Sequence, residues 1–238
     1  MQRFFLEDLN TKNYSFTLIN KEIINQIIKV LRSKIWDKVI FFDGEDLYDY
    51  IFEIKEIGKK EIIFEQIDRL KKESEIDFEL NLFQAIPNKM DKIESIIKNG
   101  TQTWITNFLF FKAERSQKLN ISEKKEKRLN KIILEASEQS ERNIIPSLII
   151  WDKIDFKNLE WQNLFFHTKN NKSEFLKNIK IESSLQINLF VWPEWGFSDL
   201  EIEEFEVNDF TRIYLWERIL RTELAGVSSA FSIIQNNT

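Results

Sequence analysis

Short strand-like runs alternate with helical patterns from residue 78 onward, and this alternation limits the possible folds more than any other feature. Met90, Ile93 and Ile97 lie on one helical face, and that helix is expected to stop at Gly100 as a C′ glycine. Strands that alternate with helices are joined by crossovers and pair in parallel. The pattern therefore predicts an α/β domain over residues 78–238. The apolar strand-like runs cover residues 78–83, 105–111, 163–167 and 187–191.

Residues 1–70 show a different pattern, in which β-rich runs surround one helix. Turn signals at Gly44 and Gly58 separate these runs, as expected for hairpins in a small β-barrel. Residues 71–77 are mostly charged and carry no period, so they are predicted to link the barrel to the α/β domain. The helical face consists of Ile24, Ile27, Ile28 and Leu31.

Charge and composition exclude several classes of protein. The net charge of −5 argues against nucleic-acid binding through bulk positive charge but allows a local basic patch. The absence of cysteine excludes disulfides and cysteine–zinc sites, and no metal-ligand spacing is present. No apolar run approaches the roughly 20 residues that span a bilayer. The N-terminus is too short in apolar character for a signal peptide, so a cytoplasmic protein without membrane or metal is predicted.

Two segments near the C-terminus each join a strand-like run to a helical pattern. One covers residues 191–197 and precedes Ser198, which forms a capping box with Glu201. The other covers residues 215–222. Each segment alone fits an ordinary strand-to-helix turn. Open parallel sheets bind ligands beyond the carboxyl ends of their strands, between separate loops, so the pair predicts one ligand site.

Basic side chains concentrate in residues 112–131, where eight basic residues face only three acidic ones. A solvated helix face is one interpretation, and contact with RNA phosphates is the other. In contrast, residues 194–209 contain seven acidic residues and no basic one, so this surface should point away from RNA. Gln139 flanks an apolar helical stripe, which suggests a polar interface position. The residues predicted to contact phosphate in the basic segment are Lys112, Lys124, Lys125 and Lys127.

Several blocks, in order along the chain, resemble the RsmE-like family of 16S rRNA uridine-N3 methyltransferases, which belongs to the SPOUT class. The blocks lie at residues 1–5, 29–32 with 39–44, 84–87, 114–116, 135–142, 193–198 and 218–223. The resemblance implies a trefoil-knotted C-terminal domain and an N-terminal PUA-like RNA-binding barrel. It also implies a homodimer that uses S-adenosylmethionine to methylate N3 of a uridine in 16S rRNA or the small ribosomal subunit.

The same resemblance assigns roles to individual residues. Arg115 and Arg221 are expected to stabilise an anion or position a phosphate, and Glu223 is a candidate base. Arg32 and Arg142 are expected to contact RNA. His167, the single histidine, ends an apolar run, which favours a structural role over a general base. The expected cofactor-binding residues are His167, Val191, Trp192, Pro193, Glu194, Trp195, Gly196, Leu215, Trp216, Ile219, Leu220 and Thr222.

Tryptophan stands at positions where the family carries glycine. The chain has seven tryptophans but only five glycines, whereas average usage of about 7% gives roughly 17 glycines. One explanation is a degenerate, catalytically inactive RNA-binding or ribosome-associated homologue whose donor pocket is blocked. The favoured explanation is that UGA codons read as glycine in the cell have been rendered as tryptophan. The positions are Trp36, Trp104, Trp192, Trp195 and Trp216.

Overall fold

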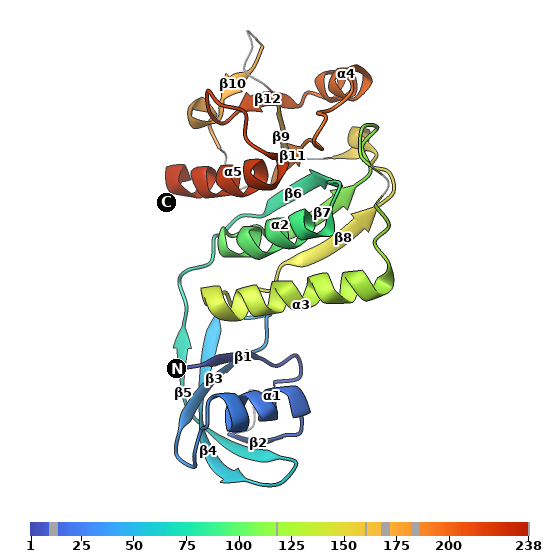
Figure 1. Ribbon diagram of the computed structural model, residues 1–238. Helices are drawn as coiled ribbons and strands as arrows, with labels where there is room; N and C mark the ends of the chain where they lie inside the picture. Colours follow the sequence, from blue (N-terminus) through green and yellow to red (C-terminus); the bar gives the residue numbers. More distant parts are fainter. Residues whose placement is uncertain (10–13, 118, 160, 168–171, 182–185, 238) are drawn as a thin grey trace. The chain divides into compact units, whose positions relative to one another are not determined.

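The computed structural model describes residues 1–9, 14–117, 119–159, 161–167, 172–181 and 186–237 (Figure 1). The chain forms two compact units. One consists of Met1–Glu75 with Ser137–Ile145, and the other of Ile76–Ala136 with Pro146–Thr238. The sequence predicted a single boundary at residues 71–77. In the structure, residues 137–145 also belong with the N-terminal unit. Among the described residues, no helix is long and apolar enough to cross a bilayer.

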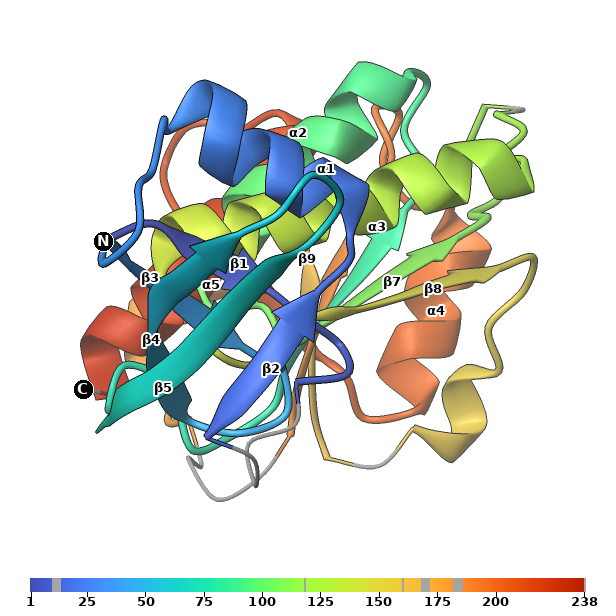
Figure 2. The same cartoon turned by 90° about the horizontal axis from the view of Figure 1, so that it is seen from below.

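A mixed five-stranded sheet with the order β1-β3-β4-β5-β2 forms the first unit (Figure 2). β1 pairs with β3 in parallel, and the other neighbours are antiparallel. The predicted helix is present as α1 (Lys21–Asn25), which continues as a π-helical segment, η1 (Gln26–Val30). β1 and β2 are the edge strands and do not pair with each other, so barrel closure stays a prediction. The strands are β1 (Arg3–Phe5), β2 (Ser15–Leu18), β3 (Lys38–Phe42), β4 (Tyr48–Ile57) and β5 (Ile62–Lys71).

Gly44 explains one of the hairpin signals. It lies in the turn between β3 and β4 and has a φ of +83°, a backbone conformation that residues with a side chain rarely adopt. A Cβ atom at this position would lie 2.6 Å from Cγ1 of Ile145 and 2.9 Å from a ring carbon of Phe5. The turn therefore needs glycine both for its backbone conformation and for the close approach of residues 137–145.

Arg142 lies in a buried ion-pair cluster of the first unit. Its guanidinium pairs with Glu75 at 3.2 Å, and both side chains are less than one-tenth exposed. Its backbone carbonyl accepts a hydrogen bond from Arg3, which also pairs with buried Asp49 at 2.8 Å. Burial lowers the pKa of Arg142, and the charge of Glu75 acts in the opposite direction. This arrangement favours a structural role for Arg142 over the predicted RNA contact, because the guanidinium faces a protein carboxylate inside the unit.

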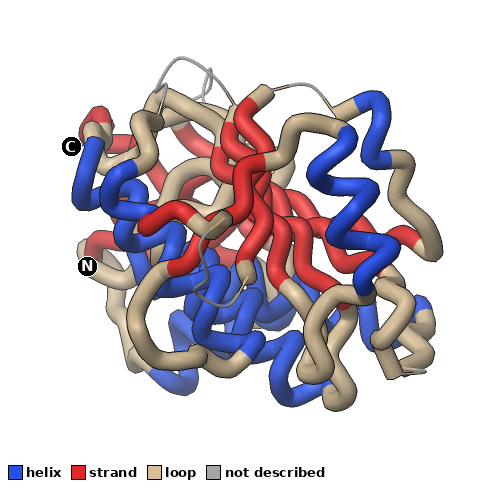
Figure 3. The backbone as a smooth tube through the Cα atoms, turned by 90° about the horizontal axis from the view of Figure 1, so that it is seen from above, coloured by secondary structure: helices blue, strands red, loops and turns tan. Residues whose placement is uncertain are grey.

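Seven parallel strands with the order β10-β12-β9-β11-β6-β7-β8 form the sheet of the second unit (Figure 3). This confirms the parallel α/β class that the alternating pattern predicted. β11 lies between β6 and β9. The strands β6, β7 and β8 extend the sheet on one side of β11, and β9, β12 and β10 extend it on the other. The strands are β6 (Leu80–Ala85), β7 (Asn107–Phe111), β8 (Ser147–Trp151), β9 (Gln162–Phe166), β10 (Glu174–Phe175), β11 (Ile187–Val191) and β12 (Thr211–Tyr214).

Helices cover both faces of this sheet. On one face, Gly100 of α2 and Gly226 of α5 allow close packing, since a Cβ atom would lie 2.6 Å from Phe108 and from Leu82, respectively. On the other face, Phe205 of α4 packs with its ring centroid 4.9 Å from that of Phe165. Gly100 is thus inside α2 and does not end it, which corrects the predicted helix end. The helices are α2 (Met90–Gln102), α3 (Glu123–Ser140), α4 (Asp199–Val207) and α5 (Thr222–Asn237), with 3-10 turns at η2 (Phe156–Asn158) and η3 (Leu176–Asn178).

A ladder of side-chain hydrogen bonds crosses five strands near their amino ends. Asn188 on β11 donates to Asn163 on β9 at 2.8 Å and accepts from Asn81 on β6 at 2.9 Å. Asn81 in turn accepts from Asn107 on β7 at 2.6 Å, which accepts from Ser147 on β8 at 2.5 Å. Buried polar groups are costly unless they are paired. The ladder therefore favours a single register for the five strands and so fixes where their carboxyl ends lie.

Candidate functional site

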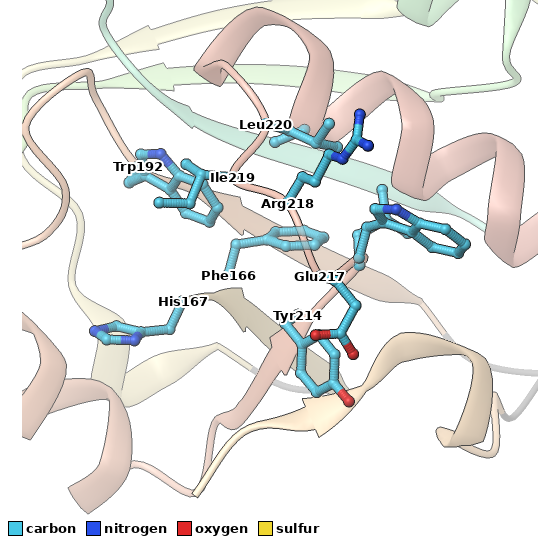
Figure 4. Close-up of a pocket in the computed structure, with 11 residues that line it drawn as sticks. Phe166, His167, Trp192, Tyr214, Glu217, Arg218, Ile219 and Leu220 are labelled. Carbon is cyan, nitrogen blue, oxygen red and sulfur yellow. The ribbon is translucent and has the colours of Figure 1, made fainter. Parts of the chain in front are cut away.

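A small cavity of about 40 Å³ lies beyond the carboxyl ends of three adjacent strands, β9, β11 and β12 (Figure 4). Phe166 and His167 line it from the end of β9, and Trp192 lines it from the end of β11. Residues 214–220 and Ala225, in the first turn of α5, complete the wall. The two loops that the sequence singled out therefore meet at this edge of the sheet, as predicted.

The carboxylate of Glu194 ties the loop after β11 to α2 and to the segment just before α2. The carboxylate of Glu194 accepts a hydrogen bond from the Lys92 ammonium at 2.6 Å and another from the backbone N–H of Asn88 at 3.0 Å. Burial acts to raise the pKa of Glu194, but these hydrogen bonds outweigh it, and the pKa lies below its ordinary value. Glu194 is thus an ionised anchor for the loop.

Arg115 holds the same loop from the segment that follows β7. Its guanidinium donates to the backbone carbonyl of Phe197 at 3.0 Å and to that of Trp195 at 3.3 Å. A guanidinium presents several donors in a fixed fork, which suits it to bridge two carbonyls. Arg115 was predicted to stabilise an anion or to position a phosphate, and in the structure it contacts two backbone carbonyls of this loop.

The two loops are also joined to each other. The hydroxyl of Thr222, at the start of α5, donates to the carbonyl of Trp192 at 2.5 Å and accepts from Gln84 at 2.9 Å. Gln84 is fully buried at the end of β6. The sequence interpretation missed Gln84 and Lys92 as site residues. The signal that could have identified Gln84 is its amide side chain at the end of an otherwise apolar strand.

The predicted cofactor-binding residues divide into two groups. Six of them line the cavity, namely His167, Trp192, Leu215, Trp216, Ile219 and Leu220. The others lie in the strand or in the loop framework behind it, namely Val191, Pro193, Glu194, Trp195, Gly196 and Thr222. The lining also includes residues that were not predicted, namely Phe166, Tyr214, Glu217, Arg218 and Ala225.

Arg221 and Glu223 lie together where α5 begins. The guanidinium of Arg221 is mostly exposed and stands 3.9 Å from a carboxylate oxygen of Glu223. The other carboxylate oxygen, Oε2, is buried and has no hydrogen-bond partner among the described residues. An unpaired buried oxygen retains its capacity to accept a proton or a hydrogen bond. This pair therefore provides an exposed guanidinium and an unpaired carboxylate oxygen at the start of α5.

The basic segment borders a second cleft of about 490 Å³ beyond the ends of β6, β7 and β8. Lys112 and Asp152 line it and pair at 3.2 Å, and Ile86 and Trp151 supply apolar walls. The Lys125 ammonium donates to the carbonyl of Asn120, which is also in the lining, at 2.6 Å. Lys124 is exposed, and Lys127 pairs with Glu123 on α3 at 2.6 Å. Arg32, in the first unit, is exposed at the end of η1.

The amino-acid sequence of this chain matches a family of known enzymes. Residues 72–235 match the RNA methyltransferase domain family. A ribosomal RNA small subunit methyltransferase E from Mesomycoplasma hyopneumoniae is 31% identical over 95% of this chain and 96% of its own length. One from Buchnera aphidicola is 30% identical over 94% of this chain and 89% of its own length. The chain belongs to the family of ribosomal RNA small subunit methyltransferase E enzymes.

Solved structures show the same fold. A crystal structure of a ribosomal RNA small subunit methyltransferase E from Neisseria gonorrhoeae, bound to S-adenosyl methionine, superposes with a TM-score of 0.86. The two sequences are 22% identical, and the match covers 99% of this chain and 97% of the other. At this identity the likeness supports the fold, while the family assignment rests on the sequence matches.

Proposed function

We propose that this chain transfers a methyl group from S-adenosylmethionine to N3 of a uridine in the RNA of the small ribosomal subunit. The observation that carries the proposal is the meeting of the 192–197 and 215–222 loops at one edge of the sheet, inside the segment that matches the family. Sequence relatives named as small-subunit rRNA methyltransferases support the type of substrate. The catalytically inactive alternative predicts RNA binding without donor binding.

The donor site falls at the cavity between the two loops, but the side chains that line it do not fit the donor. Pockets for ligands of this size occupy roughly 300–1,000 Å³. The cavity measures about 40 Å³, and Trp192 and Trp216 both form part of its wall. The tryptophan side chains at these two positions are therefore the obstacle to a donor of this size.

The RNA is proposed to approach along the basic segment and the 490 Å³ cleft beside it. Lys112, Lys124, Lys125 and Lys127 supply positive charge there, and the cleft combines apolar walls with polar groups. Phosphate contacts give affinity, and apolar walls suit an unstacked base. Arg32 is a further candidate phosphate contact from the first unit.

Deprotonation of the acceptor is assigned to the pair at the start of α5. N3 of uridine is a weakly acidic imide, so a neutral-pH enzyme must assist loss of its proton and stabilise the anion. Glu223 is the candidate base, because its Oε2 is buried and unpaired among the described residues. Arg221, 3.9 Å from the Glu223 carboxylate, is the candidate cation. Arg115 acts as a positioning residue through its two backbone contacts.

A trefoil knot, a PUA-like barrel and a homodimer belong to the same proposal. Three large apolar side chains on α5 and just before it support a dimer surface there, since Ile219, Leu224 and Phe231 are all exposed. Isolated exposed apolar residues are common, but several around one helix indicate an interface. Sedimentation at micromolar concentration is expected to show a dimer, and a monomer would refute this part of the proposal.

The proposed reaction is tested with small ribosomal subunits and separately with free 16S rRNA, each supplied with labelled S-adenosylmethionine. Nuclease digestion and mass spectrometry should then find N3-methyluridine. Glu223→Gln is expected to lower the rate without lowering RNA affinity, and Glu174→Gln on the short strand β10 serves as the matched control. Methyl groups on another atom or nucleotide would refute the uridine-N3 assignment. RNA binding without donor binding or methyl transfer would favour the inactive alternative.

A further inference from the structure

We infer that glycine is the native residue at Trp36, Trp104, Trp161, Trp192 and Trp216, and that the glycine form has an open donor pocket. The part that concerns the pocket rests on the proposed function, whereas the part that concerns backbone conformation does not. Three of the positions are identified by their φ angles and two by their place in the cavity wall. Trp161 was not among the positions that the family resemblance had indicated.

Trp36 occupies the third position of a tight turn. The backbone N–H of Asp37 donates to the carbonyl of Lys34 at 3.1 Å, which closes the four-residue turn. Trp36 has a φ of +78°, and Ile35 before it is not in the positive-φ region. A positive φ near +80° at the third position alone defines a type II turn, which requires glycine or asparagine there. An indole at this position is strained by the backbone, whatever space surrounds it.

Trp104 stands where a helix terminates through a left-handed residue. α2 ends at Gln102 with Thr103 as its C-cap, and the backbone N–H of Ile105 donates to the carbonyl of Gly100 at 3.1 Å. This is the six-to-one hydrogen bond of a Schellman motif, in which the C′ residue is usually glycine. Trp104 is that C′ residue, and its φ is +58°.

Trp161 has the largest positive φ of any described residue, +84°. The positive-φ residues that are neither tryptophan nor glycine, Arg32, Glu141 and Asp209, have φ values between +55° and +61°, inside the ordinary left-handed well. Trp36 and Trp161 lie beyond that well, where the two positive-φ glycines also lie, Gly44 at +83° and Gly196 at +74°. The backbone at Trp36 and Trp161 therefore has the conformation of glycine.

Exposure supports the same conclusion. Trp36, Trp161, Trp195 and Trp216 are between 48% and 70% exposed, although tryptophan is usually well buried. Trp151 behaves differently. Its φ is ordinary, it is partly buried, and its ring centroid lies 6.1 Å from that of Phe83. Trp195 is exposed, but it has an ordinary φ and does not line the cavity, so neither criterion assigns glycine to it. A single codon, UGA, that the cell reads as glycine accounts for the five positions together.

At the donor site, glycine would remove two indole side chains from the cavity wall. Trp192 packs its ring against Phe166 with a centroid separation of 5.8 Å, inside the lining (Figure 4). The hydrogen bond that ties its loop to Thr222 is accepted by the Trp192 carbonyl and does not involve the ring. Replacement by glycine therefore enlarges the cavity while the loop keeps its anchor.

The inference is tested first on the protein isolated from its source, by mass spectrometry of peptides that contain each position. Glycine is expected at all five positions. Tryptophan in the native peptides at residues 36, 104 and 161 would overturn the inference, and tryptophan at 192 and 216 alone would overturn the part that concerns the pocket. This measurement does not depend on any activity.

Recombinant full-length variants provide the second test. Trp36→Gly, Trp104→Gly and Trp161→Gly are each expected to raise the unfolding temperature by roughly 2–4 °C, whereas Trp151→Gly should lower it. Trp192→Gly combined with Trp216→Gly should increase affinity for S-adenosylmethionine by roughly tenfold or more in calorimetry. Lower unfolding temperatures for all three φ variants would overturn the inference. Glycine in the native peptides without donor binding would instead refute the proposed function and leave the inference standing.

Discussion

The asparagine ladder makes a quantitative prediction, because Asn188 lies at its centre. Asn188, Asn81 and Asn163 are all less than one-tenth exposed. Asn188→Ala removes the amide group that donates to Oδ1 of Asn163 and the oxygen that accepts from Nδ2 of Asn81. Each buried polar atom left without a partner costs about 1–3 kcal/mol. With two such atoms, the free energy of unfolding should fall by about 2–6 kcal/mol.

Asn107→Ala is the matched control for this prediction. Asn107 belongs to the same ladder but is only partly buried, and its other partner, Ser147, lies on the exposed edge strand β8. Water can replace the partner that Ser147 loses, so only Oδ1 of Asn81 is left as a buried atom without a partner, and the expected cost is about 1–3 kcal/mol. Urea unfolding, followed by circular dichroism with the slope compared between variants, measures both values.

A combined variant separates the ladder from simple loss of volume. When Asn81, Asn163 and Asn188 are all replaced by alanine, fewer polar atoms remain unpaired at the centre of the ladder. The cost should therefore be less than the sum of the three single costs, since paired groups are strongly non-additive. The reasoning is refuted if Asn188→Ala costs no more than Asn107→Ala, or if the three substitutions are additive.

Three further predictions concern charged residues. Lys92→Met should lower the free energy of unfolding by about 0.5–1 kcal/mol near neutral pH, because the pair with Glu194 is partly exposed. The folded-state pKa of Glu194 is depressed, so this contribution is present above its unfolded-state pKa of about 4.3 and is lost as the pH falls through the lower folded value. The free energies of unfolding of variant and parent should therefore converge in acid. Lys89→Met is the control. Arg142→Met should cost about 3–5 kcal/mol in urea unfolding, because Glu75 stays buried without its partner, while the RNA affinity of the folded protein is unchanged; weaker RNA binding would restore Arg142 as an RNA contact. Replacement of Lys124, Lys125 and Lys127 by glutamate should weaken RNA binding and reduce its dependence on salt, and an unchanged salt slope would show that this face of α3 is merely solvated.

Local features of the fold could be predicted from the sequence. The capping box of Ser198 and Glu201 is present at the start of α4, and β11 covers the predicted residues 187–191. Both depend on residues close together in the chain. The end of α2 was predicted wrongly, because Gly100 is needed for close packing against Phe108 inside the helix and not for a left-handed cap.

Features that depend on distant residues could not be predicted in this way. Arg142 was expected to contact RNA, but it pairs with Glu75, which lies far away along the chain. The ladder requires the register of five strands, which no local pattern specifies. A signal for it was nevertheless present, because the triplet Asn-Leu-Phe recurs at residues 81–83, 163–165 and 188–190. Similar strands in parallel register bring identical side chains side by side.

The anchors of the 192–197 loop explain why the site can be recognised although its cavity is small. Lys92 binds a carboxylate, Arg115 binds two backbone carbonyls, and Thr222 binds a third. None of these contacts uses an indole ring, so all of them can persist with glycine at residue 192. Loops held by several elements before a ligand arrives lose little freedom on binding. The capacity of this site therefore depends on the side chains at residues 192 and 216, while its position is already set by the backbone contacts.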